Sequence, residues 1–172
     1  MTNPSSPPRT GAPDKPGAVV AGPGAGAMQA LDVMLGHHAR LLRLCDALES
    51  IADSLPERVD VRQCLQTARG LGPAVRDAHR FEEEVFYPLA RAVIGPRPRF
   101  EENLTRLQDE HREDESFADE AAEALMDWGL CGGPRGSDMT GYMLRGLFET
   151  LRRHIAFERE YLVAPVEDHL AR

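Results

Sequence analysis

Four histidines of this sequence fall one each into four stretches of helical periodicity: His38, His79, His111 and His154. Three of them are followed four residues later by a glutamate: Glu83, Glu115 and Glu158. Residues four apart on an α-helix are rotated by roughly 40°, so both side chains leave one face of the helix. Imidazole and carboxylate groups bind iron, manganese and zinc. The spacing therefore predicts a metal site to which four helices contribute.

The four histidines together are stronger evidence for a metal site than any one of them alone. A single histidine on a half-apolar helix is more often a hydrogen-bonded core residue than a ligand. Here six histidines exist in the whole chain, and four of them lie one to a helix. Counted from one end of an antiparallel bundle, these four lie roughly 8 to 15 residues deep, at about 1.5 Å per residue. They therefore share one level, as ligands of one site must.

Apolar residues recur at three-and-four spacing in four segments, which predicts an all-α bundle of four helices; the family resemblance given below implies that it is an up-and-down antiparallel bundle. The segments cover about residues 28–54, 56–94, 100–128 and 137–162. Pro56 suits the first turn of the second helix, and Gly70, Gly72 and Pro73 are expected to kink or break that helix. Pro165 is expected to bend or end the fourth.

Composition narrows the class of protein. A chain of 172 residues is long enough for one domain with a full hydrophobic core. Its 20 basic and 28 acidic residues are interleaved and give a formal charge of −8, so nucleic acid and acidic lipid are not expected partners. Three widely spaced cysteines, without a Cys-x-x-Cys pair, predict neither a disulfide framework nor a thiolate zinc site.

The N-terminal segment differs from the rest of the chain. Residues 1–27 are dominated by Pro, Gly, Ser and Ala, too poor in large apolar groups to offset the entropy of ordering. We expect a disordered tail over residues 1–27 and a single bundle domain over residues 28–172. No stretch approaches the ~20 apolar residues of a membrane span, and no hydrophobic signal core is present, so a cytoplasmic protein without a membrane partner is expected.

The number of ligands favours two metals over one. Four imidazoles and two or more carboxylates are too many for a tetrahedral zinc that keeps a water, whereas two irons could take two histidines each and share two glutamates. The absence of thiolate ligands disfavours structural zinc and iron–sulfur clusters. We expect two iron ions with an oxo or hydroxo bridge, and manganese or zinc is also compatible with these ligands.

The segments around these residues resemble the hemerythrin-like, or HHE cation-binding, domains. The resemblance rests on the pattern around His38 and on the stretches HRFEEEVFYP, DEHRED and HIAFERE, and it covers about residues 28–170. It implies a four-helix bundle with terminal histidine ligands and bridging carboxylates. The implied terminal ligands are His38, His79, His111 and His154, and the implied bridges are Glu83 and Glu158.

Three positions of this ligand set stay open. Relatives often have one more residue before the pair that corresponds to Tyr87-Pro88, so Glu82 could bridge in place of Glu83. Glu115 stands where the oxygen-carrying hemerythrins have a second histidine, and it is either a ligand or part of a solvated helix face. His37 adjoins His38 and points about 100° away from it, so it competes for the same role.

The resemblance and the ligand set together favour a non-haem di-iron protein that binds, senses or reacts with a small oxidant, either a diatomic gas (dioxygen or nitric oxide) or peroxide. Because Glu115 replaces the second histidine of the oxygen carriers, the ligand set favours stress sensing or redox chemistry over reversible oxygen carriage. The redox chemistry includes peroxidase-like, catalase-like or nitric oxide-reducing turnover. The alternatives are an iron-storage or oxygen-carrying protein without turnover, and a metal-free helical interaction module. The sequence names no protein partner and leaves open a monomer or a homodimer.

Overall fold

The computed structural model describes residues 23–132 and 137–171, and all of its regular elements are helical. In chain order they are α1 (Pro23–Ser54), α2 (Val61–Phe81), the π-helical η1 (Glu82–Phe86), α3 (Tyr87–Ile94), α4 (Pro98–Cys131), α5 (Ser137–Glu158), the π-helical η2 (Arg159–Val163) and α6 (Ala164–Leu170). Within the described residues α2, η1 and α3 follow one another without a break, as do α5, η2 and α6.

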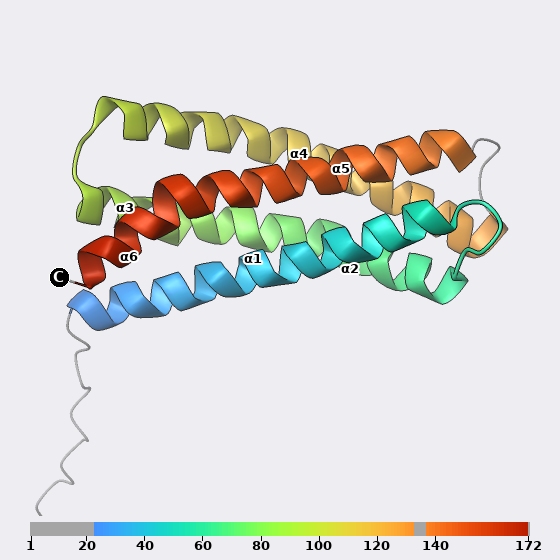
Figure 1. Ribbon diagram of the computed structural model, residues 1–172, viewed down its shortest axis with the longest axis horizontal. Helices are drawn as coiled ribbons and strands as arrows, with labels where there is room; N and C mark the ends of the chain where they lie inside the picture. Colours follow the sequence, from blue (N-terminus) through green and yellow to red (C-terminus); the bar gives the residue numbers. More distant parts are fainter. Residues whose placement is uncertain (1–22, 133–136, 172) are drawn as a thin grey trace, which may run out of the picture.

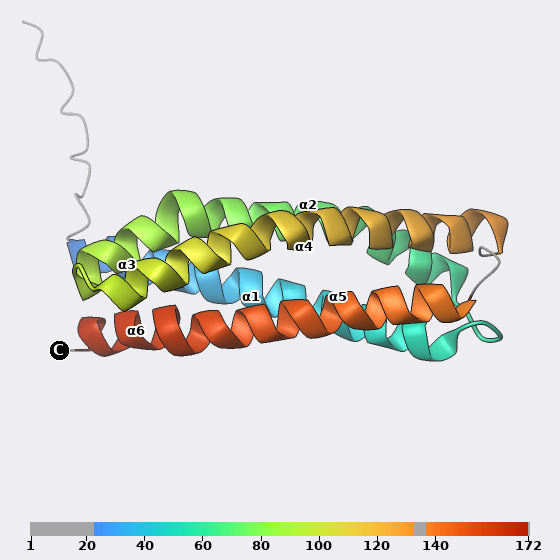
Figure 2. The ribbon, with the colours of Figure 1, turned by 90° about the horizontal axis from the view of Figure 1, so that it is seen from above.

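Four long helical rods therefore run up and down beside one another (Figure 1). The rods contact in the cyclic order α1, α2, α4, α5, so each lies between two neighbours and the α1–α2 side is opposite the α4–α5 side. Figure 2 shows the same antiparallel arrangement from above. The predicted up-and-down four-helix bundle is confirmed.

Several helix boundaries differ from those expected. α1 begins at Pro23 and not at Met28, because proline fits the first turn of a helix. The end of the segment expected to be disordered is thus helical, while residues 1–22 lie outside the described residues. α2 begins at Val61 and not at Pro56, because the Asp60 carboxylate accepts the backbone N–H groups of Arg62 and Gln63.

The breaks expected inside the second and fourth rods do not occur. α2 runs through Gly70, Gly72 and Pro73 as one helix, with Pro73 on its exposed side. The fourth rod remains helical past Pro165, which lies just after η2. A proline removes one backbone hydrogen bond, and packing of the surrounding apolar residues is sufficient to keep both rods helical here.

Buried apolar residues form two separate clusters along the bundle. The larger, which we call the loop-end core, lies toward the α1–α2 and α4–α5 connections and includes Leu48, Leu71, Leu125 and Leu147. The smaller, the terminal-end core, lies toward the start of α1 and toward α6, and includes Met34, Phe86, Leu107 and Leu162. No helix of the described residues is long and apolar enough to cross a membrane.

Candidate metal centre

A layer of ionisable side chains lies between the two cores, and each member is at most 4% exposed. Its members come from α1, α2, η1, α4 and α5: His38, His79, Glu82, His111, His154 and Glu158. The side chains form two groups whose ligand atoms lie within 4.8 Å of one another. The first group is His79, Glu82, His111 and His154, and the second is His38, Glu82 and Glu158. Glu82 belongs to both.

Close contacts join the two groups into one cluster. The rings of His79 and His111 are stacked with centroids 3.9 Å apart, and His111 Nε2 lies 3.2 Å from Glu82 Oε2. Glu158 connects the other two helices, since its Oε2 is 3.0 Å from His38 Nε2 and its Oε1 is 3.7 Å from His154 Nε2. The four predicted histidines are therefore brought together at one level of the bundle.

Three of the histidines direct Nδ1 outward to a carboxylate on a neighbouring helix. The distances are 3.2 Å from His79 Nδ1 to Glu115 Oε1, 2.7 Å from His111 Nδ1 to Glu83 Oε1, and 3.2 Å from His154 Nδ1 to Glu110 Oε2. A carboxylate that accepts from one ring nitrogen fixes the ring and leaves the other nitrogen for a metal. The Nε2 atoms of all three rings face the cluster.

These contacts give the adjacent residues Glu82 and Glu83 different roles. Glu82 is 1% exposed and lies inside the cluster, whereas the Glu83 side chain is 39% exposed and contacts only the outward nitrogen of His111. Glu83 lies four residues after His79 and would share its face on an ideal α-helix, but the chain becomes π-helical at Glu82. The ideal rotation per residue no longer applies beyond that point.

Glu115 also lies outside the cluster, at the outward nitrogen of His79. The two His-x-x-x-Glu pairs of α2–η1 and α4 are thus reciprocal, because each glutamate contacts the histidine of the other helix. Spacing within one helix cannot reveal such an exchange. Glu110 and Asp114 of α4, which the sequence did not single out, contact the outward side of His154 at 3.2 and 3.8 Å.

Tyr87 is a further buried polar group at the centre. Its hydroxyl donates a 2.9 Å hydrogen bond to Glu158 Oε1 and lies 3.2 Å from His111 Nε2. The side chain is fully buried, and burial together with the Glu158 and Glu82 carboxylates raises the pKa of its hydroxyl. The sequence signal nearest to this role of Tyr87 is its position before Pro88.

Several buried atoms at the cluster lack a hydrogen-bond partner among the described residues: His79 Nε2, His154 Nε2 and Glu82 Oε2. Buried polar atoms of folded proteins are almost always paired, and an unpaired one costs free energy. Two imidazole nitrogens and a carboxylate oxygen that converge on one point are the donor set of a divalent transition metal. These atoms therefore fit a bound metal ion.

A family comparison agrees with this geometry. Residues 29–165 match the family model described as the hemerythrin HHE cation binding domain. This chain belongs to the hemerythrin HHE family. Comparison with curated proteins and with solved structures gave no match. The family is described as cation binding, and the HHE domain of this chain contains a His/Glu cluster that can hold a metal.

The histidines of this HHE domain are divided three to one between the two groups, not two to two as expected. His38 alone comes from α1, on the far side of Glu158 from His154. Its neighbour His37 is half-buried outside the cluster and packs on Phe81 with ring centroids 5.3 Å apart. His169 is exposed on α6.

Burial and mutual contacts shift the acid–base properties of this HHE domain. Burial, with His111 and His154 nearby, lowers the pKa of His79 to about 2. Burial and the Glu158 charge raise the pKa of Glu82 well above its ordinary value. Burial disfavours a charged His154, but Glu158, whose Oε1 lies 3.7 Å from His154 Nε2, and the other nearby carboxylates raise the pKa of His154 to about 9. The carboxylates thus attract positive charge into the site.

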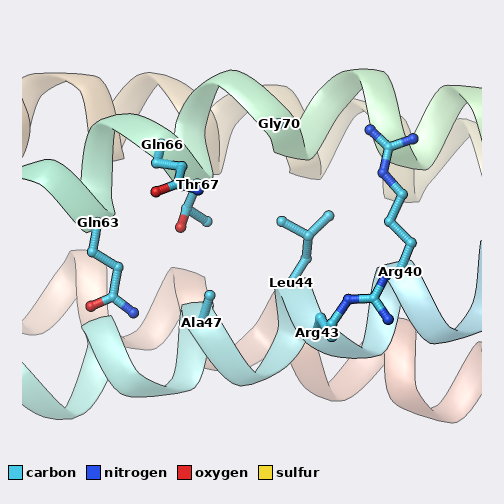
Figure 3. Close-up of a pocket in the computed structure, with 8 residues that line it drawn as sticks. All are labelled: Arg40, Arg43, Leu44, Ala47, Gln63, Gln66, Thr67 and Gly70. Atoms are coloured by element: carbon cyan, nitrogen blue, oxygen red, sulfur yellow. The ribbon is translucent and has the colours of Figure 1, made fainter.

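Two surface hollows lie on opposite sides of the HHE domain. Figure 3 shows the one between α1 and α2, about 510 Å³ in volume, where Arg40 and Arg43 lie at one end, Gln63 and Thr67 lie at the other, and Leu44 lies between them. None of its lining residues belongs to the buried cluster. The hollow between α4 and α5, about 350 Å³, includes His154 in its wall and so reaches the cluster.

Proposed function

We propose that this chain is a non-haem di-iron protein that binds or reacts with a small oxidant. One iron would be held by His79, His111, His154 and Glu82. The second would be held by His38, Glu82 and Glu158. The observation that carries this proposal is that Glu82 belongs to both ligand groups, because a shared carboxylate is the natural bridge between two adjacent metals.

Two adjacent ferrous ions would supply electrons to dioxygen, nitric oxide or peroxide. The protein's own part is to enclose the site and to place protons there. Met34 and Phe86 are fully buried in the terminal-end core next to the cluster and keep bulk water away from one side. Tyr87 holds a proton at its hydroxyl, 2.9 Å from Glu158 Oε1.

The three-to-one division of histidines supports unequal metal positions. The first group offers four protein ligands and the second offers three. Since iron commonly takes up to about six ligands in carboxylate sites, the position beside His38 has more room for an external ligand. We infer that the small oxidant binds on the His38 side, next to Tyr87 and Glu158.

Metal analysis and spectroscopy test the proposal together. Protein from iron-replete cells should contain about two irons per chain, because the buried histidines and glutamates form two adjacent ligand groups. An anaerobic ferrous sample exposed in turn to oxygen, nitric oxide and peroxide should change its visible spectrum with at least one of them. Repeated cycles of consumption would indicate an enzyme, and a single stoichiometric change would indicate a sensor or a carrier.

Two results would contradict the di-iron assignment. One is a metal content that stays near one per chain under excess iron. The other is a protein that takes up no metal and melts at the same temperature with and without a chelator, which would favour a helical interaction module.

A further inference from the structure

The hollow between α4 and α5 is acidic where it meets the metal cluster. Three carboxylates line it, Glu110, Glu113 and Asp114, and His154 forms part of its wall. His154 separates the hollow from the cluster, because its Nδ1 faces Glu110 and Asp114 while its Nε2 lies 3.7 Å from Glu158 Oε1. A cation in the hollow is thus one imidazole ring away from the buried ligands.

Asp114 is the residue that most needs a partner in this hollow. It is 2% exposed, and its Oδ2 atom has no hydrogen bond within the described residues. Among the described residues, the basic side-chain nitrogen within 4 Å of it is His154 Nδ1 at 3.8 Å, which is too far for a hydrogen bond. A buried carboxylate oxygen left unpaired is unfavourable, and a metal cation entering the hollow would satisfy it.

The two arginines of the hollow form no ion pair with Glu113 or Asp114 among the described residues. Arg106 donates to Glu110 Oε1 at 2.7 Å and so balances the charge of Glu110, and its guanidinium lies 4.5 Å from the centre of the Phe157 ring. Arg153 lies at the surface, where it contacts Thr150. Glu113 is exposed and forms no ion pair with any residue that the structure describes, so its charge is available to a cation.

The hollow on the opposite side of the bundle is lined by basic side chains instead of acidic ones. The α1–α2 hollow of Figure 3 presents Arg40 and Arg43 and no carboxylate, and it contains no member of the cluster. Cations approaching a chain of net charge −8 would therefore be directed to the α4–α5 side.

We propose that the α4–α5 hollow is the entry site through which a divalent cation loads the buried centre. The ion exchanges water for the carboxylates of Glu113 and Asp114 and then passes His154 to reach Glu82 and Glu158. This proposal rests on the proposed metal centre and adds a second, transient binding site outside it. Glu113 and Asp114 would thus set the rate of loading without being ligands of the final site.

The rate of metal uptake tests the entry site. Chelator-treated full-length protein is mixed anaerobically with ferrous ion at low ionic strength, and the remaining free ion is followed with a ferrous-specific dye. Glu113→Gln and Asp114→Asn should each slow uptake by about threefold or more, since local charge commonly changes association rates by at least this factor. The final iron content should stay at the wild-type value.

Glu120→Gln is the matched control. Glu120 lies seven residues, or about two turns, after Glu113, so it is on the same exposed side of α4 but outside the hollow. This variant should load at the wild-type rate. Raising the ionic strength should slow the wild type toward the rate of Glu113→Gln, because screening removes the same attraction.

Three outcomes would overturn one or both proposals. Equal uptake rates in all four proteins, with full final loading, would remove the entry site and leave the metal centre intact. Asp114→Asn with a lower final iron content, beside a wild-type rate for Glu113→Gln, would make Asp114 a structural support of His154. A wild-type protein that takes up no ferrous ion would overturn the metal centre itself.

Discussion

At the scale of single residues, the two nitrogens of each imidazole have different partners. His79, His111 and His154 each place Nδ1 against a partly exposed carboxylate and Nε2 toward the cluster. Those outer carboxylates are Glu115, Glu83 and Glu110. Outer partners of this kind orient the ring and make it a better ligand. They therefore affect metal affinity without touching the metal.

The adjacent glutamates Glu82 and Glu83 give a sharp test of this division. Glu82→Gln should lose metal, because it removes the one carboxylate that both ligand groups share. Glu83→Gln should retain the metal content but weaken affinity by about 10- to 100-fold, the usual effect of losing an outer carboxylate. Elemental analysis gives the first result, and titration against a competing chelator gives the second. The reverse pattern would restore Glu83 as the bridging ligand.

The adjacent histidines His37 and His38 provide a second matched pair. His38→Ala should lower the iron content from about two toward one per chain, because His38 is the single histidine of its group. His37→Ala should leave the content unchanged, since His37 packs on Phe81 outside the cluster. If His37→Ala empties a position and His38→Ala does not, the first helix is one residue out of register.

His154 makes the chelator-treated protein sensitive to pH. Its pKa is raised from 6.5 to about 9 in the folded chain, so its contribution to stability is complete below pH 6.5 and is lost as pH rises through 9. The free energy of unfolding should therefore fall between pH 6.5 and 8.5, by up to about 1.4 kcal/mol per pH unit. Urea unfolding measures this slope.

Two variants complete the pH experiment. His154→Gln should flatten the slope, and His169→Gln, at an exposed position on α6, should leave it unchanged. A wild-type stability that rises over this interval would show that His154 is neutral in the chelator-treated protein.

At the scale of elements, each π-helical segment lies directly beside a candidate bridging carboxylate. Glu82 begins η1, and Glu158 is the last residue before η2. Each segment is followed at once by a proline-containing turn, at Pro88 and at Pro165. A proline lacks the N–H group that an α-helical turn would use, which is consistent with the wider turn before it. Short π-helical turns are often found at functional sites.

This explains which parts of the site the sequence could predict. The common level of the four histidines follows from ideal α-helices, and His38, His79, His111 and His154 do meet. The choice between Glu82 and Glu83 depends on a local departure from ideal geometry after His79, which residue spacing does not contain. Glu83 contacts the histidine of α4, and Glu115 contacts the histidine of α2. These cross-helix contacts depend on how the two helices pack, and residue spacing within one helix does not predict them.

α2 contains a glycine whose replacement should stabilise the fold. Gly70 was among the residues expected to kink or break the helix, yet it lies in the interior of α2 and a Cβ there would meet no atom within 4 Å. Gly70→Ala should raise the free energy of unfolding by about 0.5–1 kcal/mol, mainly by restricting the unfolded chain. Thermal or urea unfolding of the metal-loaded protein measures the change.

Gly129 near the end of α4 is the control for this substitution. A Cβ at Gly129 would overlap the Leu65 side chain of α2, so Gly129→Ala should destabilise the bundle by about 1–3 kcal/mol. Equal effects of the two substitutions would mean that close packing of α4 on α2 is not what distinguishes these positions.

At the scale of the whole molecule, the polar layer divides the hydrophobic core into two parts. The loop-end core has 20 buried residues and the terminal-end core has 11. The four helices followed from periodicity and their up-and-down arrangement partly from the family resemblance, but this division of the core did not, because the histidines sit on the same apolar stripes as the core residues. A bound metal would cross-link α1, α2, α4 and α5 at the layer where apolar packing is interrupted.

Removing the metal should therefore loosen the bundle unevenly. Without metal, the layer keeps buried polar atoms that lack partners, and each core must hold its own end of the rods. The terminal-end core is the smaller, so α3, α6 and the first turns of α1 and α4 should open first. Hydrogen exchange followed by mass spectrometry should show much faster exchange there after chelation, while α2 and α5 near Leu71 and Leu147 change little.

The loop-end core provides the internal reference for this experiment. Trp128 lies in that core and is 6% exposed, and its indole N–H lies 3.3 Å from Thr140 Oγ1. Its fluorescence should stay that of a buried indole after chelation, while exchange at the opposite end rises. Equal acceleration along all four rods would mean that the metal stabilises the bundle as one cooperative unit, and unchanged exchange would mean that no metal bridges the rods.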